Sequence, residues 1–131
     1  MKVLALDYGR ARTGVAVSDP TGTIARPVGV VEQAGSDQGL ARLMQLIGEH
    51  EVECVIVGMP LTLRGERGEQ ARETEAFIET LAGATDVPVV AFDERFTTDL
   101  AEQMAAATED EDARAAAHLL SSYLVWASAR A

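Results

Sequence analysis

The hydrophobic periodicity changes partway along this chain, and that change constrains the fold more than any other feature. Three apolar segments, residues 2–7, 13–18 and 23–32, have strand character and are separated only by short turns. Consecutive strands joined in this way form an antiparallel meander. Pro27 predicts an edge position for the third strand, because proline cannot donate a hydrogen bond to a neighbouring strand.

After the third segment, helical and strand patterns alternate. Apolar residues at helical spacing predict helices over residues 40–47 and 74–81. Strands are expected at 54–57 and 87–92, and the remainder of the chain reads as helical with a break near Thr108. Strand-helix-strand units require parallel neighbours with right-handed crossovers. The predicted fold class is therefore α/β: a mixed five-stranded sheet flanked by helices.

Length and composition predict one globular domain spanning residues 1–131, with 47% hydrophobic residues to form a core. Cys54 is the chain's one cysteine, so an internal disulfide is excluded.

The apolar runs of the chain are too short to cross a bilayer. Asp7 interrupts the first apolar run after four residues, which is not the pattern of a signal peptide. We expect a cytoplasmic protein with no membrane association.

The net charge of −10 argues against tight non-specific binding to nucleic acid, which requires a basic surface. Exposed charges are screened beyond about 8 Å at physiological salt, so local charge matters more than the total. Carboxylates that hold divalent cations also present a positive site to a phosphate. Local or partner-assisted binding to nucleic acid therefore stays open.

Ligands in such sheets gather beyond the carboxyl ends of the parallel strands. Asp7 ends the first strand and begins a pattern with Gly9, Arg12 and Gly14. The glycines leave room for a phosphate near the backbone, and the Arg12 guanidinium is suited to bind it through two hydrogen bonds. The alternative is that Asp7 only caps the strand before a turn.

Asp93 and Glu94 end the fifth strand and are followed by Arg95. Side chains alternate along a strand, so only one of the two acids is expected to point toward the centre. The alternation does not decide which one. The alternative is a solvated strand end with a local pair between Glu94 and Arg95.

Asp112 lies at the start of the last helix, four residues before Ala116, and it continues that helix's apolar stripe. Thr108 and Glu111 have the spacing of a capping box, which would place Asp112 one position further into the helix. Acidic residues also suit the positive end of a helix dipole. That alternative does not explain why one acid lies in register with the core.

Three acids in one cleft repel one another unless a cation lies between them. Magnesium and manganese prefer oxygen ligands and can activate water for phosphodiester hydrolysis. Asp7, Asp112 and one of the two acids at 93–94 therefore predict a metal-dependent nuclease.

Four segments of the chain also resemble a known family. They are LDYG with Arg12 and GVA at residues 6–16, VGMP at 57–60, DERFTT at 93–98, and the helical pattern that runs from Asp112 to Leu124. Together, in this order and spacing, they resemble the YqgF/RuvX family, which is described as Holliday junction resolvases and as nucleases of pre-16S ribosomal RNA.

The resemblance implies a ribonuclease H-like fold with strand order 3-2-1-4-5. It implies catalytic and metal-binding acids at Asp7, Glu94 and Asp112, with Mg²⁺ or Mn²⁺ as cofactor, and so selects Glu94 by analogy. It further implies a role in 5′-end maturation of the 16S ribosomal RNA precursor. The residues expected to contact nucleic acid are Gly9, Arg12, Arg64, Arg95 and Thr97.

One segment departs from the family pattern. Residues 104–112 are acidic where the family usually has lysines and arginines, which argues against strong binding of a four-way DNA junction. Two alternatives stay open: a Holliday junction resolvase acting on branched DNA, and a non-catalytic module that binds ribosomal or transcription complexes.

His118 lies off the apolar stripe of the last helix and is expected to be exposed. Trp126 borders the stripe and either packs on the sheet or marks a homodimer contact.

Overall fold

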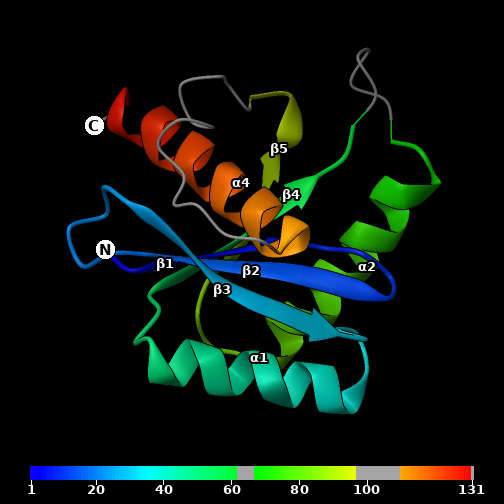
Figure 1. The fold of residues 1–131 in the computed structure, drawn as a ribbon. Helices are drawn as coiled ribbons and strands as arrows, with labels where there is room; N and C mark the ends of the chain where they lie inside the picture. The colour runs from blue at the N-terminus through cyan, green and yellow to red at the C-terminus, as the bar shows by residue number, and fades with distance from the viewer. Residues whose placement is uncertain (62–66, 97–109, 131) are drawn as a thin grey trace.

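A computed structural model describes residues 1–61, 67–96 and 110–130. Its centre is a five-stranded sheet in the order β3-β2-β1-β4-β5, which confirms the predicted order (Figure 1). The strands are β1 Val3–Asp7, β2 Arg12–Ser18, β3 Ala25–Glu32, β4 Cys54–Met59 and β5 Val89–Asp93. The helices are α1 Asp37–Glu49, α2 Glu69–Ala84, the short 3-10 helix η1 Glu94–Phe96, and α4 Glu111–Ser128.

The sheet combines an antiparallel half with a parallel half. β1 pairs antiparallel with β2, and β2 with β3, as the short turns predict. β1 and β4 pair in parallel, and so do β4 and β5, because α1 and α2 provide the long connections. Pro27 lies in the edge strand β3, so that prediction is confirmed.

Alternation along β1 separates the two faces of the sheet. Leu4 and Leu6 are buried in a cluster with residues of α1 and α2, whereas Val3 and Ala5 are buried in a cluster with residues of α4. Figure 1 shows the same arrangement, with α4 on one face and α1 and α2 on the other. Since side chains on a strand alternate with a period of two, Asp7 lies on the α4 face.

The start of α4 differs from the predicted capping box. Asp110 is the N-cap residue, and its carboxylate accepts hydrogen bonds from the backbone N–H groups of Asp112 and Ala113. Glu111 is the first helical residue, not the third, so the predicted cap at Thr108 is wrong. An aspartate beside the helix start satisfies the same orphan N–H groups. Thr108 itself and the predicted helical stretch before it lie outside the described residues.

The far end of α4 packs on the sheet through aromatic side chains. Trp126 contacts Phe92 of β5 edge to face, with ring centroids 5.8 Å apart, and Tyr123 contacts Phe92 at 5.5 Å. Trp126 therefore packs on the sheet, which is the first of the two predicted alternatives. Across the described ranges, no helix is long and apolar enough to cross a membrane.

Candidate active site

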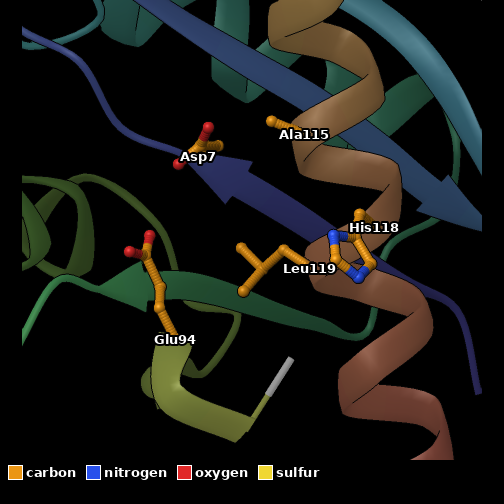
Figure 2. Close-up of a pocket in the computed structure, with 5 residues that line it drawn as sticks. All are labelled: Asp7, Glu94, Ala115, His118 and Leu119. Atoms are coloured by element: carbon orange, nitrogen blue, oxygen red, sulfur yellow. The ribbon is translucent and has the colours of Figure 1, made fainter. Parts of the chain in front are cut away.

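A pocket of about 270 Å³ lies between the carboxyl ends of the parallel strands and α4. Its lining includes Asp7 from the end of β1, Glu94 from η1, and Ala115, His118 and Leu119 from α4. Figure 2 shows the carboxylates of Asp7 and Glu94 pointing toward one another, with the three α4 residues on the other side of the pocket. Two of the three predicted acids thus line one cavity.

Two glycines on the strands beside β1 make this arrangement sterically allowed. Gly14 is the register partner of Asp7 in β2, and a Cβ atom there would lie only 1.8 Å from the backbone oxygen of Asp112. Gly58 in β4 leaves space for Glu94: a Cβ atom there would lie 2.6 Å from the Glu94 Oε1 atom. One glycine therefore admits the start of α4 and the other admits the Glu94 carboxylate.

The two carboxyl groups in the pocket hold protons more tightly than usual. Burial raises the pKa of Asp7, and the negative charge of Asp112 raises it further. Burial also raises the pKa of Glu94, followed by the charge of Asp7, by a hydrogen bond with Asp7 and by the charge of Asp93. The hydrogen bond between the two carboxyl groups lowers the pKa of Asp7 and raises that of Glu94.

Asp93, the neighbour of Glu94, is turned to a different partner. Its carboxylate binds Arg95 through hydrogen bonds from the guanidinium, one of them 2.6 Å long between Arg95 Nη2 and Asp93 Oδ2. These hydrogen bonds lower the pKa of Asp93. The structure therefore brings Glu94 into the pocket with Asp7, and it places Asp93 in a local ion pair. The alternative pair between Glu94 and Arg95 is not formed.

Asp112 lies near this pocket but does not line it. Arg12 Nε donates a 2.7 Å hydrogen bond to Asp112 Oδ2, and Arg12 Nη2 lies 3.7 Å from Asp110 Oδ2. The Asp112 side chain is 41% exposed, so it is less enclosed than its register with the apolar stripe predicts. After burial, the negative charge of Asp112 is the second cause that raises the pKa of Asp7. Arg12, which was predicted to bind substrate, instead forms ion pairs with Asp112 and Asp110.

The donor set fits a divalent cation in part. Two partly buried carboxylates that repel one another are stable together only with a shared proton or a cation, and magnesium is commonly held by one or two carboxylates plus water. Within the described ranges, no group of three His, Cys, Asp or Glu side chains is arranged to hold a metal ion. Asp7 and Glu94 are the pair of carboxylates that suits a divalent cation, whereas the carboxylate of Asp112 is hydrogen-bonded to Arg12.

The other residues expected to contact nucleic acid are placed as follows. Gly9 forms the tight turn between β1 and β2, where a Cβ atom would lie 2.4 Å from the backbone oxygen of Arg12. Arg95 is bound to Asp93. Arg64 and Thr97 lie outside the described residues.

His118 is the residue that the sequence reasoning missed. It was expected to be exposed, but it is partly buried and lines the pocket with both carboxyl groups. Ala115 and His118 are three residues apart, so they are neighbours on the helix surface. Ala115 in turn lies three residues after Asp112, and this spacing from a predicted site residue was the available signal. The position of His118 off the apolar stripe led to the prediction that it is exposed.

The fold resembles that of two solved RuvC structures. "Thermus thermophilus RuvC structure" matches with a TM-score of 0.71 at 17% identity, covering 99% of this chain and 97% of that one. "T. thermophilus RuvC in complex with Holliday junction substrate" matches with a TM-score of 0.70 at 16% identity, covering 98% and 96%. At such identity the likeness defines the fold alone, and the class is the ribonuclease H-like fold of the resolvases, as expected.

Sequence comparisons then define the family. A model of the family "RuvX: Holliday junction resolvase" matches residues 1–125. A protein of Chloroflexus aurantiacus named "Putative pre-16S rRNA nuclease" is 45% identical over 102 residues, which cover 78% of this chain and 67% of the relative. A protein of Sulfurihydrogenibium with the same name is 37% identical over 131 aligned positions, covering 94% and 89%. The chain belongs to the RuvX family, also called YqgF, a family of nucleases.

Proposed function

We propose that this chain is a divalent-metal-dependent nuclease that hydrolyses phosphodiester bonds in structured nucleic acid in the cytoplasm. Its proposed substrate is the precursor of 16S ribosomal RNA, cleaved during 5′-end maturation, and one domain spanning residues 1–131 carries the activity. The observation that supports this most is the pair formed by Asp7 and Glu94, whose carboxyl groups share a pocket and a hydrogen bond. Family membership supports the same reaction class.

Asp7 and Glu94 would hold Mg²⁺ or Mn²⁺ between them. Such an ion, when bound, supplies an activated water and stabilises the negative charge that develops on the leaving oxygen. The chain's own contribution is to fix the two carboxylates at the end of the sheet. The Gly14 and Gly58 positions leave room for that geometry, and α4 closes one side of the pocket against bulk water.

Asp112 is proposed as the third acid of the site. Its hydrogen bond with Arg12 is between two half-exposed side chains, and exposed ion pairs contribute at most about 1 kcal/mol. Exchange of that bond for a cation near Asp7 is therefore energetically accessible. Arg12 would then be released toward the substrate phosphate, which reconciles its present ion pair with the predicted role in substrate binding.

Structured RNA is preferred over branched DNA as the proposed substrate for two reasons. The relatives at 37–45% identity are named for pre-16S rRNA. The chain carries a net charge of −10, and the basic side chains at the described site, Arg12 and Arg95, are both in ion pairs. A bulky four-way junction presents many phosphates and needs a wider basic surface.

Cleavage assays test the proposal. Purified protein is incubated with a precursor 16S ribosomal RNA fragment or with a four-way DNA junction, in the presence of Mn²⁺, Mg²⁺ or EDTA. The expected result is cleavage of the RNA with either ion, none with EDTA, and loss of cleavage in the Asp7→Asn and Glu94→Gln variants. If the wild-type protein cuts neither substrate, or if both variants cut as well as the wild type, the nuclease assignment fails.

A further inference from the structure

A second pocket, here called the Tyr8 pocket, lies at the same end of the sheet as the active-site pocket but on the opposite face. It has a volume of about 320 Å³ and lies between the turn after β1, the loop before α1 and the surface of α2. Tyr8 lines it from the turn and directly follows Asp7 in the chain. Tyr8 packs against the core cluster of the α1 and α2 face, whereas Asp7 lines the pocket beside α4. The end of β1 therefore separates the two pockets.

Two aromatic side chains give the Tyr8 pocket an apolar wall. The Tyr8 ring is stacked on Phe77 of α2, with ring centroids 4.3 Å apart and an angle of 16° between the ring planes. Phe77 is only 3% exposed, so the stack anchors the Tyr8 ring to the core, while Tyr8 itself stays partly exposed. A side chain held in this way loses little conformational freedom when a ligand binds, which favours binding.

The charged groups of the Tyr8 pocket balance one another. Arg10 and Glu73 both line it, and they form an ion pair with each other. Binding does not require this pair to open, because a guanidinium whose edge is bound to a carboxylate still presents its flat face for stacking. The Glu73 carboxylate has further lone pairs that accept hydrogen bonds. An uncharged ligand with apolar faces and a polar edge therefore suits this pocket better than a phosphate does.

A nucleobase is a ligand of this kind. Its faces stack on aromatic rings and on guanidinium groups, and its edge donates and accepts hydrogen bonds. A volume of about 320 Å³ falls within the range of about 300–1,000 Å³ that is typical of pockets for small organic ligands. A base enters such a pocket only when its nucleotide is unpaired, because a paired base is stacked inside its duplex.

We propose that the Tyr8 pocket binds one unpaired base of the RNA substrate, next to the phosphodiester that is cleaved at Asp7 and Glu94. This inference rests on the proposed function, because it requires that phosphodiester to lie in the active-site pocket. Consecutive Cα atoms are about 3.8 Å apart, so a strand that crosses the end of β1 brings one group to Asp7 and the adjacent group to Tyr8. The Tyr8 pocket then selects substrates with an unpaired nucleotide at the cleavage site.

Variants that fill the pocket from the surface of α2 test the proposal without disturbing the core. Ala76 lines the pocket and is exposed, so Ala76→Leu occupies the space with a larger side chain. Ala82→Leu is the matched control, because Ala82 is also exposed on α2 and is not among the described residues that line the pocket. Tyr8→Leu removes the aromatic ring, and Tyr8→Phe keeps it.

The probe is a fluorescein-labelled RNA hairpin with an unpaired 5′ flank, and Kd is measured by fluorescence anisotropy with Ca²⁺. A second set of hairpins carries one abasic nucleotide at successive positions of the flank. A third hairpin has a blunt end and no flank. Together these RNAs separate binding of a base from binding of the backbone, which all three kinds share.

The expected result is that Ala76→Leu and Tyr8→Leu each raise the Kd of the flanked hairpin about tenfold, within the range for stacking of one base on an aromatic side chain. Tyr8→Phe and Ala82→Leu should match the wild type. One abasic position should weaken the wild type by a similar factor and should cause no further loss in Ala76→Leu. The blunt hairpin should bind wild type and Ala76→Leu equally.

Three outcomes would overturn the proposal. The first is an equal Kd of Ala76→Leu and Ala82→Leu for the flanked hairpin. The second is an abasic series in which no position weakens the wild type. The third is an equal loss of affinity for the blunt hairpin in Ala76→Leu, because that RNA offers no unpaired base.

Nuclear magnetic resonance of the wild-type protein provides a test that requires no variant. The chain has two tyrosines, and Tyr123 lies on the other face of the sheet, where it packs on Phe92. The ring resonances of Tyr8 should shift when the flanked hairpin is added, and those of Tyr123 should stay in place. Tyr8 resonances that do not respond to bound RNA contradict the contact.

These measurements distinguish failure of the pocket proposal from failure of the nuclease proposal. If the wild type cuts the flanked hairpin with Mn²⁺ and Ala76→Leu binds it as tightly as the wild type, the base pocket fails and the nuclease assignment stands. If the variants lose affinity as expected but the wild type cuts no RNA, the nuclease assignment fails and the base pocket stands. Wild-type protein that binds no RNA overturns both.

Discussion

At the scale of single residues, the arrangement of Asp7 and Glu94 destabilises the metal-free fold but suits the proposed function. Both are partly buried, both have raised pKa values, and each negative charge opposes the other. A pair that only stabilised the fold would be better replaced by apolar side chains of similar volume. Raised pKa values with a specific charge partner in a pocket are typical of functional sites.

The destabilising effect of the Asp7 charge can be measured through the pH dependence of stability. The pKa of Asp7 lies above its ordinary value of 3.8, so the folded protein binds that proton more tightly than the unfolded chain. Stability from this group is therefore present at low pH and is lost as pH rises from about 3.8 through the folded pKa. Asp7→Asn should raise the Tm of the metal-free protein by a few degrees at pH 7, and the gain should shrink as pH falls through this window. Thermal unfolding monitored by circular dichroism measures both.

Asp19 provides the matched control for that experiment. Hydrogen bonds from Thr21 and from the backbone of Ile24 and Thr23 lower the pKa of this acid to about 2. Its stabilising contribution is present at pH 7 and disappears only as pH falls toward 2. Asp19→Asn should therefore lower the Tm at pH 7. If Asp7→Asn also lowers it, the two site carboxylates are not in conflict.

Gly58 allows a substitution that acts on the site more than on the fold. A Cβ atom there would lie 2.6 Å from Glu94 Oε1, and the long Glu94 side chain can move away from it. Gly58→Ala should lower cleavage between about tenfold and a hundredfold, since small misplacements of reacting groups have effects of this size. The Tm should change little. Initial rates with Mn²⁺ are compared with those of Gly83→Ala, where the added Cβ meets open space. Equal rates in the two variants would contradict the role of Glu94.

At the scale of elements, the site depends on how closely α4 approaches β2. The helix begins over Gly14, and its first turn carries Asp112, while its second and third turns provide Ala115, His118 and Leu119. Because β1 and β2 pair Asp7 with Gly14, the helix start lies beside the first acid of the site. Any shift of this helix therefore moves one side of the pocket.

Gly14→Ala tests that dependence. The new Cβ would lie 1.8 Å from the Asp112 backbone oxygen, and neither backbone can yield without moving the helix. We expect a loss of about 3 kcal/mol or more in the free energy of unfolding, the upper range for overpacking. Urea unfolding measures it, with Gly48→Ala in α1 as the control because its Cβ has no close neighbour. A loss no larger than in the control would mean that α4 does not depend on this contact.

The sequence predicted the order of the elements better than their ends. Alternating patterns fixed all five strands and their pairing directions, because burial of one or both faces leaves a periodic signal. The start of α4 was misplaced because Thr108 and Asp110 are both residue types that cap helices, and only backbone geometry separates them. The pairing of Arg12 with Asp112 spans 100 positions in the chain and has no local signal.

Within the site, the two acids at strand ends were predictable and the pocket's far side was not. Asp7 is an acid at the end of an apolar strand, and the topology places it at the same edge of the sheet as the end of β5, with β4 between the two strands. Alternation along the strand did not decide whether Glu94 or Asp93 would lie in the pocket with Asp7, and only the family resemblance favoured Glu94. Its physical cause is now visible: Arg95 binds Asp93, while Gly58 opens space for Glu94. His118 depended on the rotation of α4, which a stripe of alanines defines poorly.

At the scale of the whole molecule, charge limits how the protein binds nucleic acid. The chain carries a net charge of −10, and both described arginines near the pocket are paired. Binding should therefore rest on few phosphate contacts, and the logarithm of affinity should fall with the logarithm of salt concentration with a slope of about 2 or less. Anisotropy titrations of the RNA hairpin over a range of NaCl concentrations measure this slope. A slope several times steeper would contradict this expectation, because it would require many more phosphate contacts.

We propose that Asp7 and Glu94, joined by Asp112, hold a divalent cation at the end of the sheet. Crystals soaked in Mn²⁺ and measured at the manganese absorption edge test it most directly. We expect an anomalous peak about 2 Å from carboxylate oxygens of both Asp7 and Glu94, with Asp112 turned from Arg12 toward the ion. Crystals that show no peak between Asp7 and Glu94, or peaks only at acids elsewhere on the surface, would contradict it.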